Sequence, residues 1–252
     1  MYMRAMEDEG VMACLKHFPG HGDTDADSHL ELPRIDHTLD RLENNEFFPF
    51  RRLASQGASA VMVGHLHVPA IDSRNNRPAT LSQNAVKNLL RDDMGYNGLI
   101  FTDAMDMKGV TSHFPNGTAE AEAFLAGNDV ILLPENLPKA FNALKNYIES
   151  GKISQSRLDE SVERILRAKY KLGLNAIPYH DPDNVYDYLN RNQALAIKQK
   201  LAEASVTVVS DAKNLIPIRN VADLHLGILS INSSQKTAFQ SRADSYTDTR
   251  HY

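Results

Sequence analysis

The chain has 252 residues, 42% of them apolar and 23% charged, a composition that is typical of a folded globular protein and excludes a disordered one. The 27 basic and 32 acidic residues give a formal net charge of −5, which offers no electrostatic basis for binding nucleic acid. One cysteine excludes a disulfide framework and a cysteine-based zinc site, and no apolar run has the length of a membrane span. The length itself is typical of a complete (β/α)8 barrel.

The first ten residues have the pattern of an amphipathic helix that ends at Gly10. Short apolar runs with strand character then alternate with helical patterns, which predicts parallel βα units. The expected strands are residues 11–18, 60–66, 99–102 and 129–133. The expected helices are residues 39–56, 83–94, 118–126, 138–150 and 154–170.

The pattern changes after Gly173. Residues 175–188 carry two prolines and several Asp and Asn residues, which is typical of a linker. A helix is expected over 192–204, and further strands over 205–210 and 224–231. We therefore expect a first domain over 1–173, a linker with a connecting helix over 174–204, and a second domain that begins at 205 and continues to 252.

Polar side chains follow three of the expected strands at the points where those strands end. Lys16 and His17 come at the end of the first strand, His65 at the end of the second and Asp103 at the end of the third. In a parallel βα architecture these strand ends share one face, where active sites are built. The sequence therefore predicts that these residues meet at a common site.

A carboxylate and an imidazole stand two residues apart in the loop after the first strand, as Asp27 and His29. Such a carboxylate can stabilise an imidazolium that donates a proton near neutral pH, although the same pattern in isolation also fits an exposed loop. Asp103 in its strand-end position fits a nucleophile, a base, a metal ligand or a helix cap.

The run Lys-His-Phe-Pro-Gly-His-Gly-Asp-Thr over residues 16–24, followed by Asp27-Ser28-His29, resembles the signature of glycoside hydrolase family 3 in its β-N-acetylglucosaminidase branch. The resemblance covers residues 1–173 and continues through residues 60–65, 78–82, 98–103 and 126–129. It implies the C-terminal half of a (β/α)8 TIM-type barrel, with the family's fifth to eighth strands, followed by the start of an α/β sandwich domain. On this basis we expect a partial sequence that, expressed alone, folds poorly or self-associates and is inactive.

The resemblance also implies roles for individual residues. Asp103 matches the nucleophile of the family, and His29 matches the acid/base of this branch, with Asp27 as its partner. Lys16 and His17 match residues that hydrogen-bond sugar hydroxyls, and His65 matches a histidine at the end of the sixth barrel strand, which we expect to contact substrate. The implied site contains no metal and no cofactor.

The function implied is that of a retaining exo-β-N-acetylhexosaminidase, which removes terminal N-acetylglucosamine from peptidoglycan fragments or chitooligosaccharides through a covalent glycosyl-enzyme intermediate. Within the family, a β-glucosidase and a phosphorolytic β-glycosidase remain alternatives. Outside it, an inactive fragment is one alternative. A metal-dependent hydrolase is another, with ligands drawn from a single loop: His17, His21, Asp23, Asp27 and His29.

Overall fold

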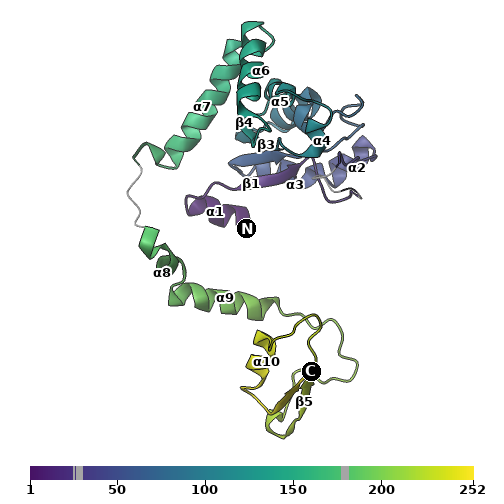
Figure 1. The fold of residues 1–252 in the computed structure, drawn as a ribbon, viewed down its shortest axis with the longest axis vertical. Helices are drawn as coiled ribbons and strands as arrows, with labels where there is room; N and C mark the ends of the chain where they lie inside the picture. The colour runs from purple at the N-terminus through teal and green to yellow at the C-terminus, as the bar shows by residue number, and fades with distance from the viewer. Residues whose placement is uncertain (25, 27–30, 177–181) are drawn as a thin grey trace. The chain divides into compact units, whose positions relative to one another are not determined.

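The computed structural model describes residues 1–24, 26, 31–176 and 182–252, and these form two compact units, Met1–Pro178 (unit 1) and Tyr179–Tyr252 (unit 2) (Figure 1). The division into three segments that ends the first domain at residue 173 stays a prediction. None of the described helices is both long enough and apolar enough to cross a membrane.

Unit 1 contains one parallel sheet of four strands, which confirms the α/β architecture predicted from the alternating pattern. The strands pair in chain order, so each neighbour in sequence is also a neighbour in space. Because all four run in the same direction, their C-terminal ends meet at one edge of the sheet. The strands are β1 (Cys14–Phe18), β2 (Ala60–Val63), β3 (Leu99–Ala104) and β4 (Val130–Leu132).

Helical segments connect the strands of unit 1. Before β2 the chain forms α1 (Tyr2–Asp8), α2 (Leu39–Asn44) and α3 (Phe47–Ala54). Between β2 and β4 it forms η1 (Ala79–Leu81), η2 (Asn84–Asp93), α4 (Lys108–Thr111) and α5 (Thr118–Ala126). After β4 it forms α6 (Leu137–Glu149), α7 (Gln155–Lys171) and η3 (Leu174–Ala176).

The single helix expected over residues 39–56 is two helices in the structure, α2 and α3. Pro49 explains the break, because proline lacks the N–H that would bond to the carbonyl of Asn45 in a continuous helix. Proline is tolerated in the first turn of a helix, and Pro49 lies in the first turn of α3. The chain therefore starts a new helix at Phe47.

The two faces of the sheet have different surroundings. On one face, Val61, Val63 and Ile100 are buried against Phe50 of α3 and Leu90 of η2. The other face borders an apolar hollow of about 610 Å³, which α7 flanks on one side. The side chains around the hollow come from all four strands and from α7, and include Cys14, Ala60, Met62, Leu99, Phe101, Val130, Leu132, Ile165, Ala168 and Leu172.

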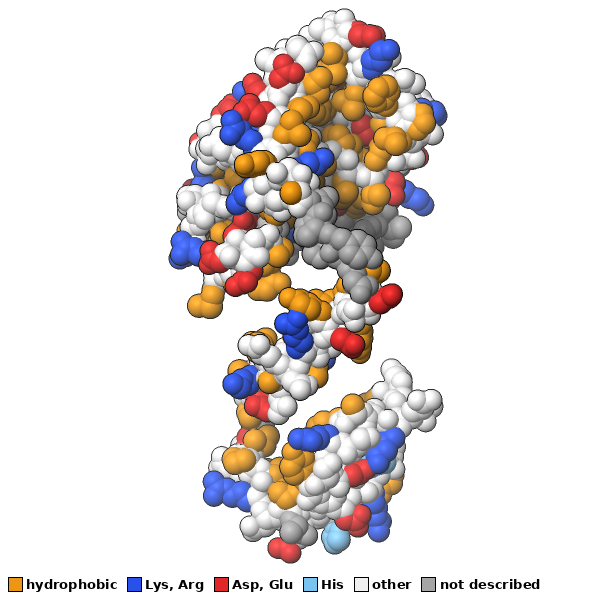
Figure 2. Space-filling view, turned by 90° about the vertical axis from the view of Figure 1, so that its left-hand side faces the viewer, with side chains coloured by type: hydrophobic (Ala, Val, Ile, Leu, Met, Phe, Trp, Pro, Cys, Tyr) orange, Lys and Arg blue, Asp and Glu red, His pale blue; other side chains and the backbone are white. Residues whose placement is uncertain are grey.

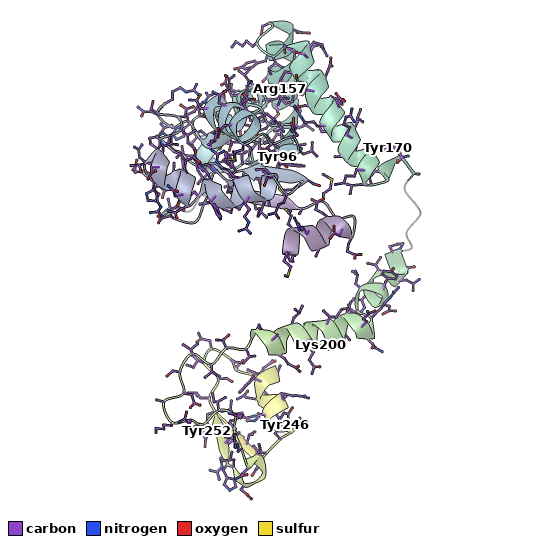
Figure 3. All side chains as sticks on the ribbon, turned by 180° about the vertical axis from the view of Figure 1, so that it is seen from behind. Tyr96, Arg157, Tyr170, Lys200, Tyr246 and Tyr252 are labelled. Carbon is purple, nitrogen blue, oxygen red and sulfur yellow. The ribbon has the colours of Figure 1, made fainter. Side chains whose placement is uncertain are left out.

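Helix α7 also carries an exposed apolar stripe. Val162, Leu166 and Tyr170 follow one another at four-residue intervals, which places them on one face of the helix. They are 45%, 58% and 73% exposed. Figure 2 shows apolar side chains gathered on this side of unit 1, and Figure 3 shows Tyr170 near the end of α7.

Unit 2 contains a small parallel pair of strands, β5 (Leu226–Ile228) and β6 (Thr249–His251). The helix expected over 192–204 is confirmed as α9 (Asn192–Ser205). The strand expected over 205–210 is wrong: Ser205 ends α9, residues 206–210 form no ladder, and Val209 is 94% exposed. β-branched residues favour a strand only where a partner strand offers a surface to pack on, and none of the described residues supplies one here. The remaining helical segments are η4 (Pro182–Asn184), α8 (Val185–Leu189), η5 (Val221–Asp223) and α10 (Ala238–Ala243).

Candidate active site

The C-terminal edge of the sheet brings together side chains that are 86 residues apart in the sequence. His17 is in β1 and Asp103 is in β3, and 3.9 Å separate Nε2 of His17 from Oδ2 of Asp103. Both side chains are partly accessible, at 28% and 17% exposure. The structure thus brings these two strand-end side chains together, while Lys16 precedes His17 as an exposed residue of β1.

The loop that follows β1 starts with an unusually close approach between backbone and helix. Gly20 has φ +136°, and a Cβ built on it would lie 2.7 Å from Cβ of Glu46, directly before α3. Only glycine fits this position without moving α3. Further along this loop, His21 lies close to His17, and the centroids of the two imidazole rings are 5.9 Å apart. Lys16, His17 and His21 line one side of a cavity of about 340 Å³.

The carboxylate of Asp103 is held by the backbone of its own strand. Oδ1 accepts a hydrogen bond of 2.9 Å from the N–H of Ala104, the last residue of β3. Burial lowers the pKa of His17, although the nearby Asp103 opposes this shift. The neutral imidazole of His17 can therefore offer a hydrogen bond to a hydroxyl without carrying a charge.

His65 is placed at the same edge but makes contacts only within the protein. The residue is 1% exposed; its Nδ1 lies 2.8 Å from Oγ1 of Thr80, and its Nε2 lies 2.9 Å from the carbonyl oxygen of Ala104. Both ring nitrogens are thus occupied. The ring connects the end of β2 to the backbone beside Asp103, and a contact between His65 and substrate stays a prediction.

Sequence reasoning gave no role to Thr80 or to Asn128. Both side chains are fully buried, and Nδ2 of Asn128 donates to the backbone carbonyl of Thr80 at 2.9 Å. The sequence pointed to these two residues only indirectly, because both lie in segments that carry the family resemblance, 78–82 and 126–129. Their link to the site through His65 is visible only in three dimensions.

The expected acid/base pair, Asp27 and His29, lies outside the described residues. Its placement relative to Asp103 therefore stays a prediction.

One cluster in the described part of the chain has side chains suited to a cation. The cluster consists of Asp23, His37 and Glu46. Each offers one potential ligand atom, and these three atoms lie within 4.8 Å of one another. The guanidinium of Arg41 already pairs with Asp23 at 3.4 Å and with Glu46 at 3.3 Å. Its positive charge therefore balances these two carboxylates. Among those ligands considered for a metal-dependent hydrolase that the structure describes, namely His17, His21 and Asp23, only Asp23 belongs to this cluster.

Comparison with known proteins identifies the family. Residues 1–168 match the model of the glycosyl hydrolase family 3 N terminal domain. β-Hexosaminidase A of Pseudoalteromonas piscicida is 32% identical over 241 residues, which are 88% of this chain and 40% of that protein. This chain thus spans less than half the length of that relative.

Solved structures agree with the sequence match. A glycoside hydrolase family 3 β-N-acetylglucosaminidase from Paenibacillus is 30% identical with a TM-score of 0.81, over 99% of this chain and 49% of that one. A β-glucoside phosphorylase is 25% identical with a TM-score of 0.84, over 100% of this chain and 48% of that one. The match of the family model to two thirds of the sequence, with these relatives, shows that the chain belongs to glycosyl hydrolase family 3.

Proposed function

We propose that this chain supplies the catalytic edge of a retaining exo-β-N-acetylhexosaminidase that removes terminal N-acetylglucosamine. The observation that carries the proposal is the pairing of Asp103 with His17 at the C-terminal edge of the parallel sheet. The relatives described as a β-hexosaminidase and a β-N-acetylglucosaminidase support this substrate class. Peptidoglycan fragments and chitooligosaccharides are substrates that carry such a terminal sugar.

In the proposed reaction, a carboxylate oxygen of Asp103 attacks the anomeric carbon while the glycosidic bond breaks. The leaving oxygen takes a proton from the imidazolium of His29, which Asp27 stabilises. A water molecule then attacks the glycosyl-enzyme intermediate and gives a proton to His29, which frees Asp103 and releases the sugar with its original configuration. In the proposal Lys16 and His17 bind sugar hydroxyls, and the closeness of His17 to Asp103 supports this role for His17.

The fold that we propose for the chain is the second half of a (β/α)8 barrel followed by the start of an α/β sandwich, with boundaries at residues 173 and 204. Four parallel βα units in chain order support the barrel. The packing of α3 and η2 on one face and the apolar hollow on the other support it as well, because a barrel has helices outside and its side-chain core inside.

A chimaera tests the activity. This chain replaces the matching segment of the Pseudoalteromonas β-hexosaminidase A, and the release of nitrophenol from p-nitrophenyl N-acetyl-β-glucosaminide is measured for the chimaera and for the chain alone. We expect an active chimaera and an inactive chain. A soluble, folded chimaera without activity would contradict the proposal and favour an inactive fragment, whereas activity that chelators abolish would favour a metal-dependent hydrolase.

Substitutions in the chimaera separate the two catalytic roles. Asp103→Asn should lower kcat by a factor of about 100 or more, because it removes the nucleophile. His29→Ala should lose far less on the nitrophenyl substrate, because nitrophenolate leaves without a proton. Asp106→Asn, which alters an exposed carboxylate three residues beyond Asp103, is the matched control and should keep full activity. Equal losses for Asp103→Asn and His29→Ala would contradict the assigned roles.

Phosphorolysis is a second candidate reaction, favoured by the structural match to a β-glucoside phosphorylase. An imidazole acid/base leaves the site less negative than a second carboxylate would, which favours entry of phosphate. The chimaera is assayed with and without inorganic phosphate, and the products are separated. A sugar 1-phosphate formed only with phosphate would identify phosphorolysis, and free N-acetylglucosamine in both cases would identify hydrolysis. Glucose released in preference to N-acetylglucosamine would indicate a β-glucosidase.

A further inference from the structure

We propose that Thr80 is a positioning residue for the nucleophile, acting through His65 on the backbone that follows Asp103. This inference rests on the proposed function for the role of Asp103. The contacts themselves lie in the buried part of unit 1, where His65 and Thr80 are 1% and 0% exposed.

The backbone that follows Asp103 is held at three points, beginning with the peptide between Asp103 and Ala104. Its N–H donates to Oδ1 of Asp103 at 2.9 Å, and so fixes the orientation of the carboxylate. The next carbonyl, that of Ala104, accepts a hydrogen bond from Nε2 of His65 at 2.9 Å. Beyond it, the N–H of Met105 donates to the carbonyl of Leu132 at 2.9 Å. His65 is the side chain that ties this turn of backbone to the neighbouring strand β2.

The contacts of His65 define which ring nitrogen carries the proton. A carbonyl oxygen only accepts hydrogen bonds, so Nε2 must carry a proton to bond to Ala104. Burial lowers the pKa of His65, against the attraction of Asp103 and Asp106, which favours the neutral ring. In a neutral ring Nδ1 is an acceptor, and the hydroxyl of Thr80, 2.8 Å away, is its donor.

The hydroxyl of Thr80 thus favours the Nε2–H tautomer of His65, which donates a hydrogen bond to the carbonyl of Ala104 beside the nucleophile. The same hydroxyl also lies within donating distance of two carbonyl oxygens, that of Gly64 at 2.9 Å and that of Val63 at 3.4 Å, and its single proton can go to only one acceptor at a time. A neutral ring that donates from Nε2 leaves Nδ1 as an acceptor, and in the proposal the proton goes to Nδ1. Without a donor at Nδ1, the ring can take the other tautomer, whose Nε2 has no proton for Ala104. The backbone beside Asp103 would then lose its bond to His65, and the N–H of Ala104 would hold the carboxylate less firmly.

Thr80 is itself fixed by Asn128, which lies two residues before the start of β4. Nδ2 of Asn128 donates to the carbonyl of Thr80 at 2.9 Å and to that of Ala123 at 2.7 Å. The side chain is fully buried, so water does not compete for these bonds. Asn128, Thr80 and His65 therefore form a continuous path of hydrogen bonds that ends beside Asp103.

The tautomer is measured directly on the full chain with ¹⁵N-labelled histidine, by NMR correlation of the ring nitrogens with the carbon-bound ring protons. We expect His65 to show the Nε2–H form at neutral pH. Thr80→Ser keeps the hydroxyl and should keep this form, whereas Thr80→Val has nearly the same shape and should give a mixture of tautomers. An Nδ1–H or doubly protonated His65 in the unsubstituted chain, or an unchanged spectrum in Thr80→Val, would overturn the inference.

Kinetics in the chimaera test the consequence for the nucleophile. Thr80→Val should lower kcat roughly tenfold and leave KM within about twofold, since misplacing a reacting group acts on the chemical step. Thr80→Ser should restore kcat to within about twofold of the unsubstituted chimaera. Ser161→Ala is the control, because it removes a buried hydroxyl that bonds to Asp129, not to His65, and should leave kcat unchanged.

The outcomes separate the two proposals. An inactive but folded chimaera refutes the proposed function, while the NMR result still decides whether Thr80 sets the tautomer of His65. An active chimaera with an unchanged kcat in Thr80→Val refutes the positioning role alone. A fall in kcat that is equal in Thr80→Val, Thr80→Ser and Ser161→Ala would indicate a loss of packing and also refute it.

Discussion

Replacing Asp129 by asparagine should destabilise unit 1 by about 4 kcal/mol, the cost expected for leaving buried cations without their counter-charge. The carboxylate is completely buried and faces three arginines. Arg91 contacts it at 2.8 Å, Arg164 at 3.1 Å and Arg157 at 3.7 Å. Figure 3 labels Arg157 on α7.

Two further contacts raise the cost of the substitution. The N–H of Ile100 donates to Asp129 at 3.0 Å and the hydroxyl of Ser161 donates to it at 2.6 Å. The asparagine amide keeps one acceptor oxygen but turns an NH₂ group towards guanidinium groups, which only donate hydrogen bonds. Burial lowers the pKa of Arg91 and of Arg157, with Asp129 opposing the shift, so this carboxylate offsets part of the cost of burying the two guanidinium charges.

Urea unfolding followed by circular dichroism measures the effect. With a slope of about 2 kcal/mol per molar urea, a loss of about 4 kcal/mol lowers the midpoint by about 2 M. The matched control is Glu163→Gln, which breaks an exposed ion pair with Arg167 on α7 and should cost less than about 0.5 kcal/mol. If the Asp129→Asn midpoint falls no further than that of the control, Asp129 is not the counter-charge that holds these arginines.

Three further predictions concern stability and association. Burial alone would raise the pKa of Asp72, but hydrogen bonds from Arg74 and Ser82 hold it at about 2. The pKa of Asp72 in the folded state lies below its unfolded value of about 4, so the ionised carboxylate stabilises the fold at pH values above about 4. This stabilisation is lost as the pH falls towards about 2. The loss of unfolding free energy caused by Asp72→Asn, measured by urea unfolding, should therefore shrink from about 2 kcal/mol near neutrality to almost nothing near pH 2. A deficit independent of pH would contradict this. Gly117 has φ +81° and a Cβ there would lie 2.5 Å from the carbonyl oxygen of Lys139, so Gly117→Ala should lower the melting temperature more than Gly151→Ala, where φ is +75° and no atom lies within 4 Å. Equal shifts would show that backbone strain alone sets the cost. The apolar hollow and the stripe through Leu166 predict that the chain alone self-associates in light scattering and that Leu166→Lys reduces this; a monodisperse monomer that unfolds cooperatively would refute the prediction.

The sequence by itself determined the order and type of most elements of unit 1. The four strands were predictable because each lies in a short run rich in apolar residues between turn residues, and this pattern is local. Their parallel arrangement followed from the alternation with helices. The strand expected over 205–210 failed for the complementary reason, since a strand also needs a partner that local sequence does not specify.

The strand-end residues were also predictable as a group, because the topology of a parallel sheet brings the ends of its strands to one edge. Tertiary structure alone decided how they are connected. His65 reaches Thr80 across 15 residues and Ala104 across 39, and Asn128 reaches Thr80 across 48. These contacts arise from the packing of η1 and of the turn before β4 against the sheet, and hydrogen bonds between residues so far apart leave no periodic trace in the sequence. The sequence therefore determined which chemistry is present at the edge of the sheet, and the packing decided which side chains hold it in place.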